Sequence, residues 1–285
     1  MSAGFTHEKL RVYQQATGFA AWSVRLLCQV PANLAVHTQL ERASISIALN
    51  IAEASSKFSA TDRCRFYDAS RGSALECGAC LDVLVAKGIS ETRVIIPGKH
   101  KLHGIVSMLV GLIRSVSPTR LHEDGITYGA DNGSFADRAE GSSEQVLFDH
   151  ENLRVYKTSL KFVAWLARSF EQVKKSDSLW SQLDRASTSA CLNIAEGNGK
   201  FTAADRGRFF RSAYGSALRC AAGLDVLAVR GDLASAVTLP GKELLLAEAS
   251  MLMGLIKNNE TGGNSDASIL KEGLDYGYDY GYDYV

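Results

Sequence analysis

Four polar side chains near residue 50 have the types and the spacing to do chemistry along one side of a helix. They follow one another at intervals of four, four and three residues, and they are Arg42, Ser46, Asn50 and Glu53. The same types recur 143 residues later, as Arg185, Ser189, Asn193 and Glu196. General acid or base catalysis by the glutamate needs a second ionisable group and a pocket, and the sequence identifies neither. We therefore predict no catalytic residue and interpret both lines as structural or assembly networks, with Asn50 and Asn193 buried and hydrogen-bonded.

A zinc-binding pattern is present in only one half of the chain. Cys77-x-x-Cys80 and His100-x-x-His103 have the ligand types of a Cys2His2 site. The equivalent positions 143 residues later are occupied by Cys220, Gly223, Glu243 and Leu246. Since only one of the four ligand positions keeps its residue type, we predict no metal site and no cofactor.

Two clusters of basic residues surround the expected starts of two helices. The first contains Lys57, Arg63 and Arg65, and the second contains Lys200, Arg206 and Arg208. Cations near a helix amino terminus face the unfavourable end of the helix dipole, so their repetition needs a reason. One reason is local pairing, because Asp62 precedes Arg65 by three residues. The other is contact with nucleic-acid phosphates, and the sequence leaves both open.

The chain of 285 residues contains two copies of one domain. Residues 5–114 align with residues 148–257 without a gap, and about half of the positions are identical. A repeat of more than a hundred residues is a duplicated domain rather than a solenoid unit. A feature that occurs in one copy alone is therefore weak support for a shared function.

Each copy contains four segments with helical periodicity. In the first copy they cover about residues 10–27, 36–54 and 60–87, and a fourth that opens at Pro97. No segment of useful length alternates with period two, so the pattern predicts an all-α fold of two tandem antiparallel four-helix bundles joined by a flexible acidic linker. The expected boundaries are 1–117 for the first bundle, 118–147 for the linker, 148–257 for the second bundle and 258–285 for an acidic tail rich in Tyr, Gly and Asp.

The formal net charge of zero conceals a segregation of charge along the chain. Residues 1–117 carry 13 Lys+Arg against 8 Asp+Glu, and residues 146–257 carry 15 against 11, whereas the linker and the tail are acidic. A basic body could bind an anionic surface for which the acidic segments compete; the alternative is that these segments only maintain solubility. No leader-like or membrane-spanning apolar run is evident, so we expect a soluble cytoplasmic protein with no membrane partner and no disulfide framework.

The last eleven residues carry tyrosine at every second position. These tyrosines are Tyr276, Tyr278, Tyr280, Tyr282 and Tyr284. In an extended chain they would share one face and could contact a protein partner or another copy. The alternative is a disordered low-complexity end.

Several strings in both copies resemble one known family. They are Gln39-Leu40-Glu41-Arg42-Ala43-Ser44 with Asn50-Ile51-Ala52-Glu53, Gln182-Leu183-Asp184-Arg185-Ala186-Ser187 with Asn193-Ile194-Ala195-Glu196-Gly197, and Met108-Leu109 with Met251-Leu252. The pattern resembles the four-helix-bundle family of proteins encoded in 23S rRNA intervening sequences. The chain departs from it at Ala54, where the motif has glycine, and at Arg219, where the motif has the glutamate that Glu76 retains.

The resemblance implies a non-enzymatic bundle that assembles into rings, typically pentamers. A related branch, the accessory variability protein of diversity-generating retroelements, is a basic pentameric barrel that binds nucleic acid and a reverse transcriptase. We therefore expect a non-catalytic self-assembling scaffold; the alternative is an accessory nucleic-acid-binding protein acting with a reverse transcriptase or structured RNA, through weak and non-specific contacts. Because five is odd, chains with two bundles each must span two rings, use an even number of bundles, or form a filament.

Overall fold

The computed structural model of the chain describes residues 5–117, 146–169 and 178–260, which are almost entirely helical. The helices are α1 Arg11–Leu27, α2 Ala35–Ser55, α3 Ala60–Ala86, α4 Thr92–Val116, α5 Arg154–Ser169, α6 Ser178–Asn198, α7 Ala203–Val229 and α8 Ser235–Glu260. Short 3-10 helices, η1 Thr6–Lys9 and η3 Asp149–Asn152, precede α1 and α5. No strand occurs in these ranges, and none of their helices is long and apolar enough to cross a membrane.

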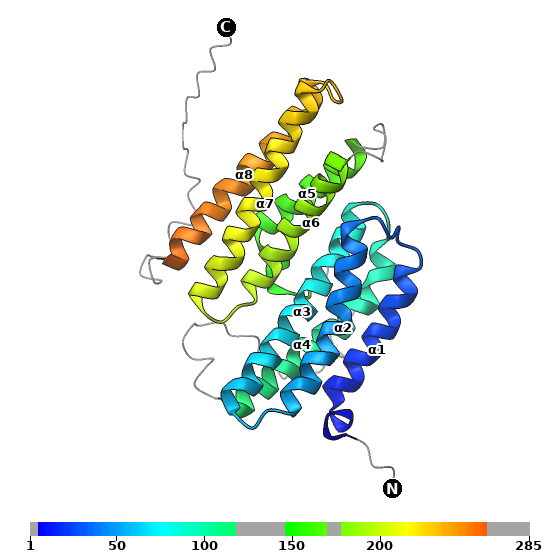
Figure 1. Cartoon of the computed structure of the whole chain (residues 1–285), viewed down its shortest axis with the longest axis vertical. Coiled ribbons are helices and arrows are strands. Elements are labelled where there is room, and N and C mark those ends of the chain that lie inside the picture. The colour runs from blue at the N-terminus through cyan, green and yellow to red at the C-terminus, as the bar shows by residue number, and fades with distance from the viewer. Residues whose placement is uncertain (1–4, 118–145, 170–177, 261–285) are drawn as a thin grey trace.

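The eight helices form two four-helix bundles, which confirms the predicted fold class (Figure 1). In repeat 1, α1 packs against α2 and α4, and α3 packs against the same two helices. Repeat 2 has the same arrangement in α5 to α8. Apolar side chains with almost no exposed surface fill both interiors, including Phe19, Leu40, Leu102, Phe162 and Leu224. Most of the predicted linker and tail, with all five tail tyrosines, lies outside the described residues.

Caps and glycines set the ends of the third helix in each repeat, as the sequence predicts. The Ser59 hydroxyl accepts a hydrogen bond from the backbone of Asp62, and Thr202 accepts one from the backbone of Asp205. Such contacts satisfy amides that have no partner within the helix. Shortly after the end of α3, Gly88 adopts a φ of 70°, a conformation that favours glycine.

The fourth helix begins earlier than predicted. Pro97 does not open α4, because the helix starts at Thr92 and places this proline within it. The missing N–H of Pro97 removes one bond near the helix start, where little of the hydrogen-bond ladder is lost. The adjacent Gly98 explains the position of the Pro-Gly pair, since a Cβ at Gly98 would overlap the ring of Trp22. A close contact between helices, rather than helix initiation, therefore accounts for the motif.

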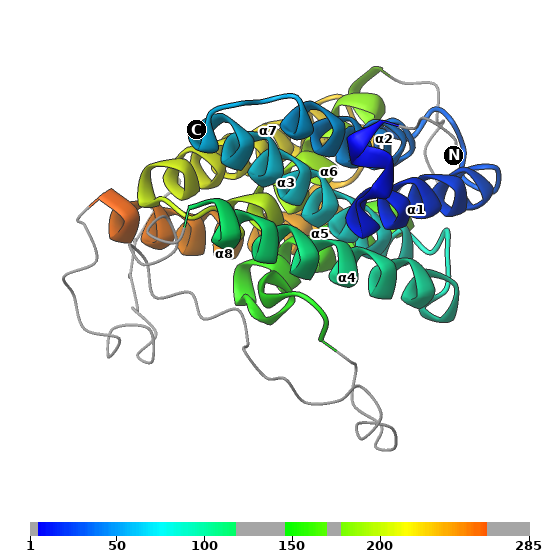
Figure 2. The same ribbon diagram turned by 90° about the horizontal axis from the view of Figure 1, so that it is seen from below.

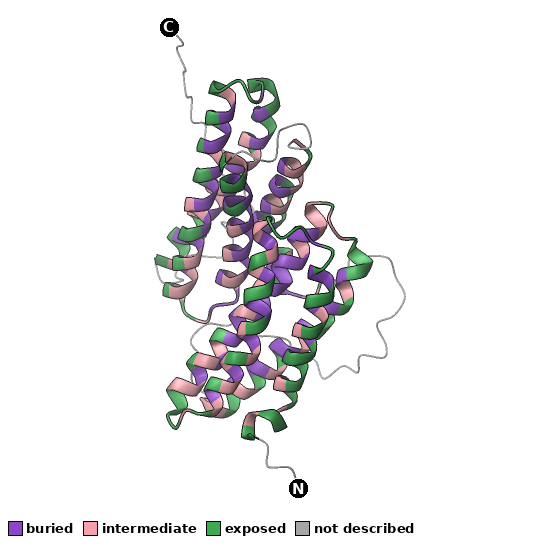
Figure 3. Ribbon diagram, turned by 45° about the vertical axis from the view of Figure 1, so that its right-hand side comes forward, coloured by how far each residue is buried: buried purple, intermediate pink, exposed green. Residues whose placement is uncertain are grey.

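The two bundles pack tightly against each other. Helix α3 contacts α5 and α6, and α2 contacts α6 (Figures 1 and 2). The larger apolar core contains Leu81 and Leu84 of repeat 1 together with Tyr156 and Ile194 of repeat 2. Figure 3 shows buried positions on the helices where the bundles meet. The repeats do not interleave their helices, but they share this larger core, while a second, smaller core lies within repeat 2 alone.

Candidate assembly interface

The repeats meet around a buried charged cluster. Lys99 of α4 reaches a carboxylate from each repeat, with its Nζ 2.7 Å from Asp82 Oδ1 and 2.7 Å from Glu151 Oε1. The hydroxyl of Tyr156 donates a hydrogen bond of 2.9 Å to Asp82 Oδ2. No more than 13% of any of the three charged side chains is exposed. Because an unpaired buried charge is costly, these contacts favour one arrangement of the repeats. We call this contact between the repeats the internal junction.

The cluster has ligand types suited to a metal ion, but a lysine lies at its centre. Ligand atoms of Asp82, His150 and Glu151 lie within 4.8 Å of one another. Burial acts to lower the pKa of Lys99, but Asp82 and Glu151 raise it overall, so the ammonium stays charged. Burial raises the pKa of Asp82, and Lys99 opposes that rise. The lysine supplies the positive charge that a metal ion would otherwise bring, so we assign the cluster a structural role.

An aromatic stack from the start of repeat 2 lies against α3. The Phe148 ring packs on Gly78, where an added Cβ would lie 3.0 Å from the ring. His150 stacks on Phe148 with centroids 5.6 Å apart, and it meets the edge of Tyr156 at 4.7 Å. Burial, with a contribution from Lys99, lowers the pKa of His150 to about 3. The imidazole is therefore neutral and acts as an aromatic packing group.

Repeat 2 also caps a helix of repeat 1. Leu34 precedes α2 and makes no side-chain cap, but the carboxylate of Asp184 accepts a hydrogen bond of 2.7 Å from the backbone N–H of Ala35. Asp184 also pairs with Lys87, and both side chains are buried. A carboxylate at a helix amino terminus is stabilised by unpaired amides and by the helix dipole. The start of α2 therefore depends on α6.

A fourth set of contacts surrounds Arg71 at the other end of the internal junction. Its side chain is fully buried and pairs with Asp68 at 2.6 Å. The guanidinium lies 3.9 Å from the centroid of the Phe201 ring of repeat 2. Lys200 lies 3.0 Å from Glu196 and 3.9 Å from Asp68, so it links the two repeats. The internal junction thus combines paired charges with stacked rings over its whole length.

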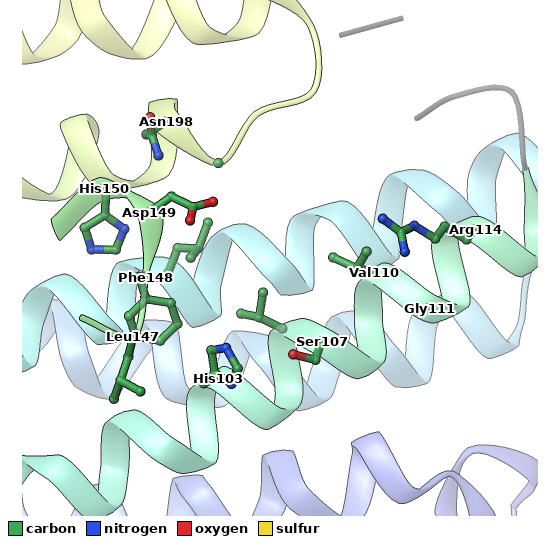
Figure 4. Close-up of a pocket in the computed structure, with 13 residues that line it drawn as sticks. His103, Ser107, Val110, Gly111, Arg114, Leu147, Phe148, Asp149, His150 and Asn198 are labelled. Carbon is green, nitrogen blue, oxygen red and sulfur yellow. The ribbon is translucent and has the colours of Figure 1, made fainter. Parts of the chain in front are cut away.

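A small cavity of about 230 Å³ opens beside the internal junction. Figure 4 shows His103 and Arg114 on α4, with Phe148 and Asn198 contributed by repeat 2. Burial, and then the nearby His100, lowers the pKa of His103, which favours its neutral form. The cavity is smaller than typical ligand pockets of about 300–1,000 Å³, and we assign it no ligand.

The predicted polar line occupies one side of α2 and of α6. Asn50 donates to the carbonyl and the hydroxyl of Ser46, at 2.8 and 2.9 Å, and Asn193 makes the same two bonds to Ser189, at 2.8 and 3.1 Å. Both asparagines are therefore hydrogen-bonded as predicted, but they are half-buried, so the predicted burial is wrong. Each amide finds its partners within its own helix, and the neighbouring residue Ile51 occupies the apolar core in place of Asn50.

The ends of the polar line differ between the repeats. The glutamates form the ion pairs Glu53–Lys57 and Glu196–Lys200. The first pair is partly exposed, with 48% of the Glu53 side chain accessible, whereas Lys200 is buried at the internal junction. The arginines at the opposite end, Arg42 and Arg185, are exposed.

Most of the duplicated basic residues have local partners. The pairs are Arg65 with Asp62 at 3.8 Å and Arg208 with Asp205 at 3.6 Å. Arg206 donates to the carbonyls of Lys200 and Phe201, both at 3.2 Å. Arg63 is half-buried, and within the described part of the chain its Nε has no hydrogen-bond partner. These contacts favour the local-pairing alternative, and phosphate contact by these residues stays a prediction.

One buried acid stands apart from the internal junction. Glu248 of α8 is fully buried in repeat 2, where burial raises its pKa to about 7. A carboxyl with such a pKa could exchange protons near neutrality. Its counterpart in repeat 1 is Ile105, so the duplication does not retain this acid.

Repeat 1 carries an unused copy of the surface that repeat 2 brings to the internal junction. Phe5 stacks on His7 with centroids 5.7 Å apart, and His7 meets the edge of Tyr13 at 4.7 Å, nearly the geometry of the buried stack. However, Phe5 is 73% exposed, whereas its counterpart Phe148 is 4% exposed. We define the aromatic face of repeat 1 by Phe5, His7, Glu8, Tyr13 and Phe58.

Repeat 2 carries an unused copy of the opposite surface. Lys242 pairs with Asp225 as Lys99 pairs with Asp82, but 39% and 58% of these two side chains are exposed. Leu218, the counterpart of a buried leucine in α3, is 48% exposed. We define the α7–α8 face by Leu218, Asp225, Val229, Lys242 and Leu246, and its apolar members are all exposed.

Both repeats match the family model described as 23S rRNA-intervening sequence protein, over residues 8–111 and 151–252, which together exceed half of the chain. The chain belongs to this family. As a 23S rRNA-intervening sequence protein it contains two family domains, which agrees with the duplication in its sequence. No curated protein and no solved structure matches it.

Sequence reasoning missed the residues that join these two 23S rRNA-intervening sequence domains. The charged cluster contains Asp82, Lys99, Glu151 and Tyr156, and its counterparts are Asp225, Lys242, Glu8 and Tyr13. All four residue types are retained in both copies. That retention was the available signal, but the positions lie too far apart in the chain for spacing to bring them together.

Proposed function

We propose that this protein is a non-catalytic, self-assembling scaffold whose chains join end to end through a copy of the internal junction. One observation carries the proposal. The internal junction joins one surface of repeat 1 to one surface of repeat 2, and an exposed copy of each surface is present on the other repeat. The aromatic face of one chain would pack on the α7–α8 face of the next.

The charges on the two exposed faces are complementary in the same way as those at the internal junction. Glu8 would approach Lys242 as Glu151 approaches Lys99, and Tyr13 would donate to Asp225. Both glutamates accept a hydrogen bond from the backbone just before their 3-10 helix, Glu8 from Phe5 at 3.0 Å and Glu151 from Leu147 at 2.9 Å, although the two donors differ by one position in the repeat. A second copy would also cover exposed apolar side chains, which on a protein surface mark interaction sites.

The contact between chains is expected to be weaker than the internal junction. Two residues that make the internal junction tight are replaced on the α7–α8 face, since Tyr214 stands where repeat 1 has Arg71, and Ala221 where it has Gly78. Because the contact joins unlike surfaces, it leaves one free face of each kind after every addition. Each chain contributes two bundles, so any closed assembly contains an even number of them.

The test uses two variants that each block one face. Phe5→Asp blocks the aromatic face and Leu218→Asp blocks the α7–α8 face, while Val24→Asp, an exposed apolar position on α1, is the control. By light scattering during size-exclusion chromatography, each blocked variant alone should be monomeric, and their mixture should form a dimer through the remaining intact pair of faces. The control should assemble like the unchanged protein. An unchanged protein that is monomeric at micromolar concentration, or blocked variants that still assemble, would refute the proposal.

A second candidate function is accessory nucleic-acid binding, which the excess of basic residues in both repeats supports. Arg65 and Arg208 are 72% and 68% exposed and so remain accessible to phosphates despite their local pairs. Binding should be weak, insensitive to base sequence and lost with added salt. A fluorescence-anisotropy titration with two unrelated oligonucleotides at two salt concentrations tests this function. No binding at the lower salt concentration would contradict the function, and tight binding to only one oligonucleotide would contradict its lack of specificity.

A further inference from the structure

A groove lined by two arginines lies beside the contact between Asp184 and Ala35. It has a volume of about 600 Å³ and is formed by α6, α7 and the start of α2. Its polar lining includes Gln39, Gln182, Arg185, Thr188 and Arg219. The groove therefore offers several hydrogen-bond donors and two positive charges to a ligand.

The two arginines of the groove lack the carboxylate partner that the equivalent position of repeat 1 contains. In repeat 1, Arg42 Nη2 lies 3.2 Å from Glu76 Oε1. In repeat 2 the glutamate position is Arg219, so a second cation replaces the partner of Arg185. Arg219 donates only to the hydroxyl of Ser216, at 3.1 Å. Neither arginine has a carboxylate partner among the described residues, so an anionic ligand would relieve two neighbouring like charges.

A buried hydroxyl points independently to a polar ligand. Thr188 lines the same groove, only 1% of its surface is exposed, and its Oγ1 has no hydrogen-bond partner among the described residues. Buried polar atoms are normally satisfied, because leaving one unpaired costs free energy. The counterpart of Thr188 in repeat 1 is Ile45, so the hydroxyl and the second arginine occur together in repeat 2 alone.

We infer that this groove binds the acidic, tyrosine-rich carboxy-terminal segment of the chain, residues 275–285. Residues 258–285 contain six acidic residues and one basic residue. Aspartates at positions 275, 279 and 283 can pair with the guanidinium groups, which form strong charge-assisted bonds with carboxylates. The tyrosine rings between them can stack on guanidinium planes and on the apolar wall that Leu179 and Val226 provide.

The segment is long enough to reach the groove from the end of α8. Glu260, the last residue of α8, pairs with Arg211 of α7 at 2.9 Å, and Arg219 lies about 12 Å further along α7. The fifteen residues from 261 to 275 can span up to about 50 Å when extended. A tether of this length gives the segment a high effective concentration at the groove, of the order of millimolar.

A photo-crosslinking experiment on the full chain tests this inference. A benzophenone amino acid replaces Tyr280, and mass spectrometry locates the crosslinked peptides after illumination. Crosslinks should concentrate in residues 179–189 and 219–226. Arg219→Glu, which restores the charge arrangement of Arg42 with Glu76, should lower the groove crosslink about tenfold. Arg42→Gln is the matched control in repeat 1 and should leave the crosslink unchanged, while circular dichroism verifies that both variants fold.

Three outcomes would overturn the inference. Crosslinks spread over the whole protein would mean that the segment has no defined site, and a groove crosslink that survives Arg219→Glu would mean that the arginines do not hold it. Oligonucleotide binding that Arg219→Glu abolishes, without a groove crosslink from position 280, would assign the groove to phosphate instead. Performing the experiment with Phe5→Asp in the background separates the result from that of end-to-end assembly.

Discussion

Replacing Lys99 by methionine should strongly destabilise the protein, because the side chain neutralises two buried carboxylates. Without its ammonium, Asp82 and Glu151 would face each other with no positive charge between them. Removing one partner of a buried ion pair typically costs about 3–5 kcal/mol. The counterpart Lys242 provides a matched comparison, since its pair with Asp225 is 39% and 58% exposed. Lys242→Met should therefore cost less than about 1 kcal/mol.

The destabilisation by Lys99→Met should depend on pH in a defined direction. Burial already raises the pKa of Asp82 above its usual value, and Lys99 opposes this. Without the lysine, the pKa of Asp82 in the folded protein rises further. The Asp82 carboxyl then favours folding while it is protonated, and it disfavours folding once the pH exceeds about 4, the pKa of an aspartate in the unfolded chain. The deficit should be large at pH 7 and should shrink towards pH 4.

Urea unfolding followed by circular dichroism measures these differences as changes in the midpoint and in the extrapolated free energy. The measurements should use the Phe5→Asp background, so that chain association does not bury Lys242. Equal losses for Lys99→Met and Lys242→Met, or a deficit that does not change with pH, would show that the charged cluster does not stabilise the internal junction.

Three further predictions concern single residues. Glu248→Gln should remove a pH dependence of stability. Because burial raises the Glu248 pKa from 4.5 to about 7, the unchanged protein should lose about 3 kcal/mol of stability as the pH rises between these values. Urea midpoints of both proteins at pH 5 and pH 8 measure this difference. Asp184→Ala should cost about 2–4 kcal/mol, because it removes a helix cap and leaves Lys87 buried without its partner, whereas Asp184→Asn should retain the cap and cost less in the same assay. Asn50→Leu should change stability by less than about 1 kcal/mol, because the amide bonds only within its own helix, and should leave the mass of the assembly unchanged, because Asn50 belongs to neither exposed face; a large loss of stability or a changed mass would count against this.

Local chemistry made much of the fold predictable. The caps at Ser59 and Thr202 and the glycine stop at Gly88 involve residues within one turn of each other, so their sequence patterns identify them directly. The Pro97 prediction failed because helix initiation and a tight packing contact both favour the same Pro-Gly pair. The sequence cannot show that a tryptophan from α1 lies over Gly98.

The candidate interface was beyond the reach of sequence patterns because its partners are distant in the chain. Asp184 caps α2 across 149 residues, and Tyr156 reaches Asp82 across 74. Glu8 and Glu151 look equivalent in the sequence, yet only Glu151 has a lysine from the other repeat. The difference between a covered and an uncovered copy of one surface comes from tertiary packing alone.

The cap that Asp184 provides to α2 has a consequence for synthesis on the ribosome. Repeat 1 emerges first, and until α6 follows, the amide of Ala35 and the ammonium of Lys87 have no carboxylate while part of the shared core faces water. At translation rates of about 5–20 residues per second, the interval between α3 and α6 lasts roughly ten seconds. During that interval the nascent first bundle is an incomplete domain that exposes the apolar surface of α3. On a polysome, where many such nascent bundles lie side by side, contacts between neighbouring chains through α3 therefore compete with the later packing of α6 on the same surface.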